Sequence, residues 1–249
     1  METAQPSGSI EEIEAPSYQE RVFFVGANGS GKTILASEMI RAYPRVVILD
    51  VKYDFPIPWQ KDDYVILSRP PGIGGAGALS WLTGDPWQSN HIVYRPRPPY
   101  DSGPWVTYWL DKMFERARKN GKKKPFVLYL DEGGWMAYSG SRLAMARVAI
   151  TGRSIGIGLW IAAQRPRGIP VEVRSEAWRM YIFFLRNLDD RKEIIANVGD
   201  DVLTEYEIRA TEGDYGFTEV RRREGGRMEV RRLPPVAFKQ RDNPKSEKE

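Results

Sequence analysis

Short apolar runs alternate with longer amphipathic stretches along most of this chain, which is the pattern of strands that alternate with helices. Phe126–Leu130 (FVLYL) is the most apolar run, and its unbroken hydrophobicity is typical of a strand covered on both faces of a sheet. The pattern therefore predicts an α/β fold with a mostly parallel central sheet and helices on both faces. Strands are predicted at 21–26, 45–50, 64–67, 92–94, 126–130, 157–163 and 177–185. Helices are predicted at 31–42, 105–119, 141–153 and 189–197.

The two ends of the chain and one internal segment depart from this pattern. Residues 69–90 are rich in Gly, Pro and Trp and are predicted to be irregular, whereas the segments 214–220 and 227–232 are predicted to pair as a short C-terminal hairpin around Glu224-Gly225-Gly226. The polar, acidic start of the chain and its charged end have compositions typical of flexible segments. The predicted division is an N-terminal arm at 1–19, one domain at 20–235 and a tail at 236–249.

A glycine-rich turn lies between the first predicted strand and the first predicted helix. The turn fits the pattern G-x-x-x-x-G-K-[ST], in which glycines let successive backbone N–H groups point at phosphate oxygens. The N-terminus of the following helix adds its dipole to this attraction. Lys32 is expected to reach the β- and γ-phosphates of ATP, and the Thr33 hydroxyl is expected to bind Mg²⁺. The predicted nucleotide-binding residues are Gly26, Ala27, Asn28, Gly29, Ser30, Gly31, Lys32 and Thr33.

An acidic pair, Asp131-Glu132, follows the FVLYL strand. Asp131 at the strand end is expected to hold Mg²⁺ together with Thr33. Glu132 is expected to orient and polarise the water that attacks the γ-phosphate, so it is the predicted catalytic base. A glutamate in this place favours a hydrolytic motor over a switch GTPase or a nucleotide kinase.

Composition narrows the class of protein further. The chain has no cysteine and a single histidine, His91, which excludes disulfides and thiolate metal sites and argues against a histidine-rich one. No apolar run is long enough for a transmembrane helix, and the N-terminus has no signal-peptide pattern, so a cytosolic protein is expected. The first 20 residues carry five glutamates and no base, so the rest of the chain has a net charge of +9. That charge suits a polyanion such as nucleic acid and equally suits ordinary solubility.

Four further segments, in order, resemble motifs of the FtsK/HerA superfamily of hexameric DNA-pumping ATPases. Leu49-Asp50-Val51-Lys52 is similar to the D-P-K segment, with Val in place of Pro. Gly152-Arg153-Ser154-Ile155-Gly156-Ile157 is similar to G-R-x-x-G-[IL], and Ala162-Ala163-Gln164-Arg165-Pro166 to [AT]-Q-R-P. Asp189-Asp190-Arg191 is a looser match to an S-R or D-S-R element. The resemblance covers about residues 21–197 and implies a RecA-like P-loop core.

The resemblance also implies roles for single residues. Gln164 would end a strand that lies between the P-loop strand and the Asp131 strand, and its amide would contact the γ-phosphate; the alternative is a buried glutamine bonded to backbone. Arg153 would reach across a subunit interface as an arginine finger, with Arg147 as the second candidate and a surface salt bridge as the alternative. Lys52 would contact either a neighbouring nucleotide site or a core acid, and Arg191 receives no role.

The short chain looks most like the genome-packaging ATPases of tailless icosahedral viruses with an internal membrane. The resemblance thus implies an ATP-driven translocase of double-stranded DNA that packages a viral genome, acts in the host cytoplasm and assembles as a ring, expected to be a hexamer. The ring can be one that closes only on ATP, DNA or a capsid, and a capsid vertex or membrane protein is a candidate docking partner. One alternative is a mobile-element DNA-transfer or DNA-processing ATPase. The other is a regulatory NTPase or kinase that does not act on DNA.

Two basic runs are candidates for DNA contact, one at 112–124 and one at 221–232. The glycine-rich stretch 133–141 is a further candidate, as a pore loop directly after the Asp131 strand. Each basic run can equally be a solvated face of the protein, so sequence alone leaves the DNA-binding surface open.

Overall fold

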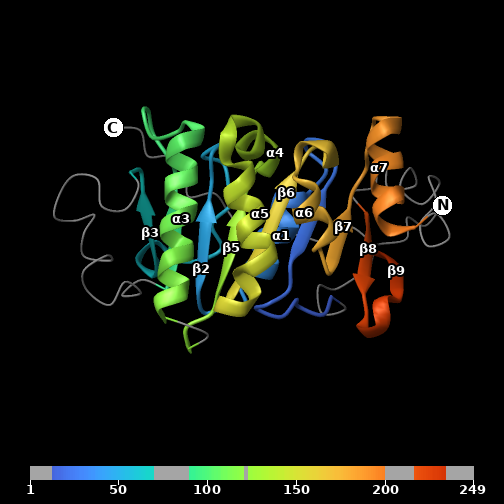
Figure 1. Cartoon of the computed structure of the whole chain (residues 1–249), viewed down its shortest axis with the longest axis horizontal. Helices are drawn as coiled ribbons and strands as arrows, with labels where there is room; N and C mark the ends of the chain where they lie inside the picture. The colour runs from blue at the N-terminus through green and yellow to red at the C-terminus, as the bar shows by residue number, and fades with distance from the viewer. Residues whose placement is uncertain (1–12, 70–89, 121–122, 200–215, 234–249) are drawn as a thin grey trace, which may run out of the picture.

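A computed structural model of the chain describes residues 13–69, 90–120, 123–199 and 216–233. Within them the backbone forms one nine-stranded sheet with the order β3-β4-β2-β5-β6-β1-β7-β8-β9 (Figure 1). The seven strands from β3 to β7 pair in parallel, and the last three strands pair antiparallel. The strands are β1 Val22–Val25, β2 Val46–Leu49, β3 Tyr64–Leu67, β4 His91–Tyr94, β5 Phe126–Leu130, β6 Ile157–Ala163, β7 Arg179–Ile182, β8 Phe217–Arg222 and β9 Met228–Leu233.

Helices cover both faces of this sheet, as the sequence predicted. Alternate residues of β5 enter two separate cores: Phe126, Leu128 and Leu130 pack in one, and Val127 and Tyr129 in the other. The first core also takes the apolar side chains of α3, α5, α6 and α7, which lie in front of the sheet in Figure 1, and the second takes those of α1, which lies behind it. The helices are α1 Lys32–Ile40, α3 Gly103–Asn120, α4 Gly133–Met136, α5 Arg142–Thr151, α6 Val171–Ser175 and α7 Leu188–Val198.

The helices and strands that the sequence predicted are present, with small shifts of their ends. The antiparallel hairpin of β8 and β9 is confirmed, and so is the position of β6 between β5 and β1. The strand predicted at 177–185 is regular only over β7, and the five-residue helix α6 before it was not predicted. Residues 133–141, the candidate pore loop, form α4 and a π-helical turn at Ala137–Ser141. None of the described helices is both long enough and apolar enough to cross a bilayer.

The start of the described chain lies against the sheet. The Tyr43 hydroxyl donates to the carbonyl of Pro16, and the Tyr43 ring meets Tyr18 edge to face. Glu14 pairs with Arg221 of β8, and Glu20 pairs with Arg179 of β7. The charges of these two glutamates are therefore neutralised by arginines of the sheet. The described part of the predicted flexible arm, residues 13–19, therefore packs on the domain. Most of the predicted irregular segment at 69–90 and the whole predicted tail lie outside the described residues.

Candidate active site

The predicted phosphate-binding loop joins the end of β1 to the start of α1. Gly29 and Gly31 have φ angles of 75° and 97°, a left-handed conformation that glycine adopts without steric cost. A Cβ on Gly26 would lie 2.5 Å from Cβ of Phe183, so glycine is also needed for close packing there. Gly31 is the N-cap of α1 and no side chain caps that helix end, so the first-turn N–H groups are suited to an anion.

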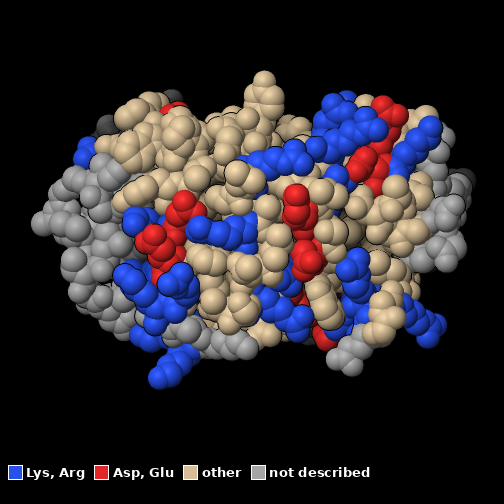
Figure 2. Space-filling view, viewed as in Figure 1, with Lys and Arg blue, Asp and Glu red and all other residues tan. Residues whose placement is uncertain are grey.

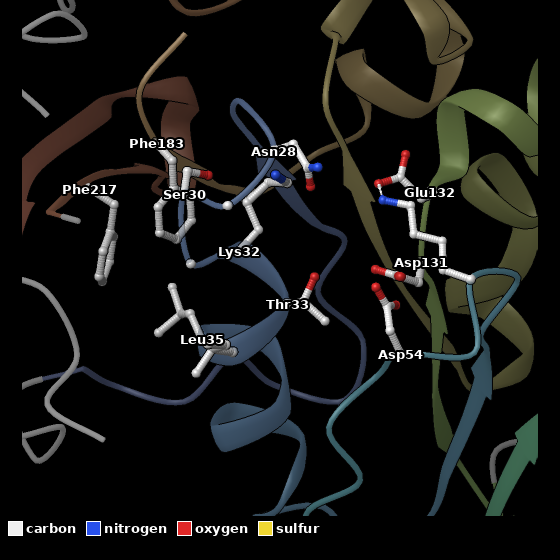
Figure 3. A pocket seen from close by; sticks show the side chains of 14 residues that line it. Asn28, Ser30, Lys32, Thr33, Leu35, Asp54, Asp131, Glu132, Phe183 and Phe217 are labelled. Carbon is white, nitrogen blue, oxygen red and sulfur yellow. Dashed lines mark hydrogen bonds and ion pairs between the residues drawn. The ribbon is translucent and has the colours of Figure 1, made fainter. Parts of the chain in front are cut away.

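The loop borders a pocket with a cavity volume of about 430 Å³, at the carboxyl ends of the parallel strands (Figure 3). The Lys32 ammonium donates to the carbonyls of Gly26 and Ala27, both at 2.8 Å, and burial lowers the pKa of Lys32 to about 8. The hydroxyl oxygen of Ser30 is buried and has no hydrogen-bond partner among the described residues, so it is a polar atom that a phosphate group would satisfy. The loop residues therefore fit a nucleotide triphosphate. The pocket is lined by Asn28–Leu35, Lys52, Asp54, Asp131, Glu132, Phe183 and Phe217.

Oxygen ligands for a cation gather on one side of this pocket. Asp131 is buried directly after β5 and accepts a hydrogen bond of 3.0 Å from the Tyr129 hydroxyl, which also interacts with Thr33. Burial raises the pKa of the Asp131 carboxyl to about 6. Carboxylate oxygens of Asp50, Asp54 and Asp131 lie within 4.8 Å of one another. A site of carboxylates and a hydroxyl suits Mg²⁺, which prefers oxygen ligands, so these residues fit the expected metal.

Glu132 lies beside Asp131 and is held by two donors on one oxygen. Its Oε1 accepts from the Lys52 ammonium and, at 3.1 Å, from the Gln164 amide. Gln164 is half-buried and bonded to this carboxylate, so it is not the backbone-bonded core glutamine that sequence left as the alternative. The structure thus brings Lys32, Thr33, Asp131, Glu132 and Gln164 to one edge of the sheet.

Arg153 lies at the other edge. It belongs to the short 3-10 turn Gly152–Ile155 that precedes β6, whereas Gln164 follows the last residue of β6. A strand rises about 3.3 Å per residue, so the seven residues of β6 separate the two by roughly 20 Å. The Arg153 side chain is exposed and its guanidinium lies 5.0 Å from the ring centre of Trp178. It cannot reach the nucleotide pocket of its own chain.

The two other arginines singled out by sequence have partners within the chain. Arg147 pairs with Asp111 at 2.6 Å and lies over the Phe114 ring, so the second finger candidate is engaged on α3. Arg191 donates to the carbonyls of Leu185 and Arg186 and fixes the chain that leaves β7.

The third and fourth motif segments meet in space. Arg165, next to Gln164, pairs with the buried carboxylate of Asp190 at 3.0 Å. A second hollow of about 580 Å³ lies here; Asn28 lines both this hollow and the nucleotide pocket, and Gln164 lines the hollow. Figure 2 shows Lys and Arg side chains gathered at this edge, between the tops of β6 and α7, and a second group over the lower end of α3. The part of the 112–124 run that lies on α3, residues 112–120, is thus largely away from the pocket edge.

Sequence reasoning missed several residues of the pocket. Tyr129 is the fourth of the five residues of the buried strand β5, and only its hydrogen bond to Asp131 reveals its place at the site. Asp54 lies in the loop after β2, and no motif marks it. Phe183 and Phe217 line the apolar end of the pocket and come from distant parts of the chain. Of the pocket residues outside the P-loop and the Asp131-Glu132 pair, sequence pointed to Lys52. It did not decide whether Lys52 contacts a neighbouring nucleotide site or an acid of the core.

No protein-family model matches this chain, and no curated protein matches it by sequence. Solved structures do match its fold. The genome packaging NTPase B204 of Sulfolobus turreted icosahedral virus 2, in complex with ATP-γ-S, is 15% identical with a TM-score of 0.63, and the match covers 89% of this chain and 100% of that one. The DNA-packaging ATPase B204 of Sulfolobus turreted icosahedral virus is 16% identical with a TM-score of 0.60, covering 88% and 98%.

Two larger proteins share the same core. ATPases 2 and 3 of EssC from Geobacillus thermodenitrificans are 13% identical with a TM-score of 0.54, covering 90% of this chain and 41% of that one. The bacterial conjugative coupling protein TrwBΔN70 is 13% identical with a TM-score of 0.52, covering 87% and 78%. At such identities the likeness establishes the fold. The chain has the RecA-like fold of the P-loop ATPases, and its structural neighbours are ATPases of the FtsK/HerA type.

Proposed function

We propose that this chain hydrolyses ATP in a Mg²⁺-dependent reaction and uses the energy to move double-stranded DNA into a preformed viral capsid. The observation that supports hydrolysis is the meeting of Lys32, Thr33, Asp131 and Glu132 at one pocket, with Gln164 hydrogen-bonded to Glu132. A protein that only binds a nucleotide would need no more than the phosphate-binding loop and the metal ligands. The glutamate held next to them is what a water-activating site requires.

Each side chain has a distinct task in this proposal. Lys32 and the loop N–H groups bind the phosphates, while Thr33 and Asp131 hold the Mg²⁺ that neutralises charge on the phosphoryl oxygens. Glu132 accepts the proton of the attacking water through the carboxylate oxygen that Lys52 and Gln164 leave open. Gln164 bonds the base and lies one residue from Arg165, so it is placed to relay the state of the phosphate to the 580 Å³ hollow.

The hydrolysis step is tested by two substitutions and a control. Lys32→Ala is expected to abolish turnover, because it removes the phosphate clamp. Glu132→Gln is expected to bind ATP normally and hydrolyse it about 10²–10⁴-fold more slowly. Glu38→Gln, which alters an ion pair on the far part of α1, should leave turnover unchanged. Near-normal turnover of Glu132→Gln would refute its role as the base.

Arg153 acts on a neighbouring subunit in this proposal, because the length of β6 keeps it away from its own pocket. The same geometry suits a ring, expected to be a hexamer, in which one subunit's lower edge approaches the next subunit's pocket. Arg153→Ala should keep ATP binding and lose about 10³–10⁵-fold in rate. Mixing it with Lys32→Ala should restore activity at interfaces that pair an intact P-loop with an intact arginine. Unchanged turnover of Arg153→Ala, at concentrations where the wild type is assembled, would exclude the finger.

Double-stranded DNA is the proposed substrate of movement. Support comes from the basic side chains grouped at the pocket edge and from the match to two packaging ATPases over nearly the full length of both chains. Binding should be independent of sequence and should weaken steeply with salt, because phosphates supply the attraction. Affinity for unrelated duplexes across a salt series measures this, and a flat salt response would contradict it. In an infected cell the motor would work in the host cytoplasm, docked on a capsid vertex or a membrane protein.

One alternative has a specific observation in its favour. The match to a conjugative coupling protein is compatible with a mobile-element DNA-transfer or DNA-processing ATPase. Both readings require that duplex DNA raises the rate of ATP hydrolysis, so that assay separates them from a regulatory NTPase or kinase that does not act on DNA. Translocation into purified empty capsids then separates packaging from transfer.

A further inference from the structure

The loop that follows β2, residues 50–55, brings an ammonium group to the carboxylate assigned as the base. Lys52 lies in this loop, and its Nζ contacts Oε1 of Glu132. The two side chains are 34% and 15% exposed, so the pair lies at the mouth of the pocket rather than on open surface. Because β2 and β5 are neighbours in the sheet, the loop after β2 and the residues after β5 share one edge.

This loop is anchored at both ends. The Asp50 carboxylate is fully buried and accepts hydrogen bonds from Arg95 at 2.8 Å and from the backbone N–H of Phe55 at 3.2 Å. The Tyr53 hydroxyl donates to the carbonyl of Pro96, and its backbone has a φ angle of 65°. A non-glycine residue in that conformation persists only where the surroundings hold it. The loop therefore presents Lys52 from a fixed platform.

Glu132 has an unusual backbone as well, with φ 56° and ψ 48°. Its side chain is held on one oxygen only: Lys52 and Gln164 both donate to Oε1, and the described residues offer no donor to Oε2. Figure 3 shows one carboxylate oxygen of Glu132 in a dashed contact and the other directed away from that contact. Two donors on a single oxygen fix the plane of the carboxylate and leave the second oxygen to accept from water.

We propose that Lys52 is a positioning residue for hydrolysis, which acts on the reaction through Glu132 by holding its carboxylate in the orientation that a base needs. The inference rests on the proposed function, because Lys52 can have this role only if Glu132 is the base. This role gives a reason for a lysine in the loop after β2, because its partner is an acid of the same chain's active site. An ammonium is suited to this contact because a charge-assisted hydrogen bond is stronger than a neutral one.

The test measures kcat and KM for ATP, at saturating duplex DNA and equal protein concentration. Lys52→Met is expected to lower kcat by about 10–10²-fold, the cost of a misplaced catalytic group, with KM within about twofold of the wild type. Lys52→Arg, which keeps the charge and a donor, should recover much of that loss. Arg41→Met is the matched control, because Arg41 also pairs with a glutamate and its side chain is 44% exposed, but it lies at the C-terminal end of α1. It should leave kcat unchanged.

A double-mutant cycle separates this role from any other. If Lys52 acts through the base, adding Lys52→Met to Glu132→Gln should not lower the residual single-turnover rate further. A multiplicative loss would mean that Lys52 acts on the nucleotide itself and would overturn the inference. A raised KM with unchanged kcat would overturn it too, and so would a normal kcat for Lys52→Met beside a slow Glu132→Gln. A normal Glu132→Gln would instead refute the proposed base. Lys52→Gln replaces Lys52→Met if the latter does not fold.

Discussion

Replacing Glu219 by leucine removes one partner of a buried arginine. Arg179 of β7 is fully buried, and it bonds Glu219 of β8 at 3.1 Å and Glu20 of the N-terminal segment at 3.0 Å. Glu219 is itself 3% exposed and also pairs with Arg231 of β9 at 2.8 Å. These contacts join both ends of the described chain to the parallel sheet. They also support β8, whose first residue, Phe217, lines the nucleotide pocket.

The expected cost of Glu219→Leu is about 3 kcal/mol in the free energy of unfolding. Loss of one partner from a buried ion pair costs about 3–5 kcal/mol, because an uncompensated charge stays buried. The lower end applies here, since Glu20 remains bonded to Arg179. For a chain of this size, 1 kcal/mol corresponds to roughly 2–4 °C in Tm, so Tm should fall by about 6–12 °C.

Denaturant and thermal unfolding of three variants test this reasoning. Glu229→Leu is the control on the same hairpin, because it breaks an exposed pair with Arg223 and should cost under about 1 kcal/mol. The double variant Arg179→Met with Glu219→Leu should be more stable than Glu219→Leu alone, since it leaves no unpaired arginine in the core. If Glu219→Leu costs no more than the control, or if the double variant is no more stable than Glu219→Leu, the buried charge is not what stabilises this junction.

Three other expectations concern the pocket and the sheet. Burial lowers the pKa of Lys32 from 10.5 to about 8, and a bound anion would raise it again, so nucleotide binding near pH 9 should take up a proton; calorimetry in two buffers of different ionisation heat measures this, and no uptake would contradict the lowered value. Asp54→Asn should raise the Mg²⁺ concentration for half-maximal turnover about tenfold, because it weakens the acidic cluster around Asp131, and an unchanged Mg²⁺ titration would remove Asp54 from the site. Gly158→Ala should destabilise the chain by about 1–3 kcal/mol in a thermal melt, since its Cβ would lie 2.0 Å from the Tyr18 carbonyl oxygen, and a wild-type Tm would show that the N-terminal segment does not pack there.

The phosphate-binding loop could be read from sequence because its parts are contiguous. Strand, turn and helix follow one another within residues 22–40, and the turn needs glycine at Gly29 and Gly31 for local backbone reasons. The hairpin of β8 and β9 is local for the same reason, and its prediction is confirmed. The place of β6 came from the resemblance to a known family, since nothing local decides which strands are neighbours.

Other features were beyond local reasoning. The helix α6 has five residues, too few to give a clear helical period, and its formation depends on packing. The polar, acidic composition of residues 1–19 predicted a flexible arm, but in its described part Glu14 is bonded by Arg179 of β7 and Arg221 of β8, far along the chain. Sequence named Arg153 as the finger candidate and Arg147 as the second candidate, and only the fold shows that Arg147 pairs with Asp111 whereas Arg153 lies over the Trp178 ring.

Sequence by itself thus determined the chemistry available to this protein: a phosphate loop, an acidic strand end, a glutamine and a set of arginines. Tertiary structure decided which of them act together. Parallel pairing of β2 with β5 puts Lys52 on Glu132 and Asp54 beside Asp131, while the length of β6 sends Arg153 to the opposite edge from Gln164. The physical reason is that strand order and strand length fix distances between residues far apart in the chain, and neither is encoded in any one segment.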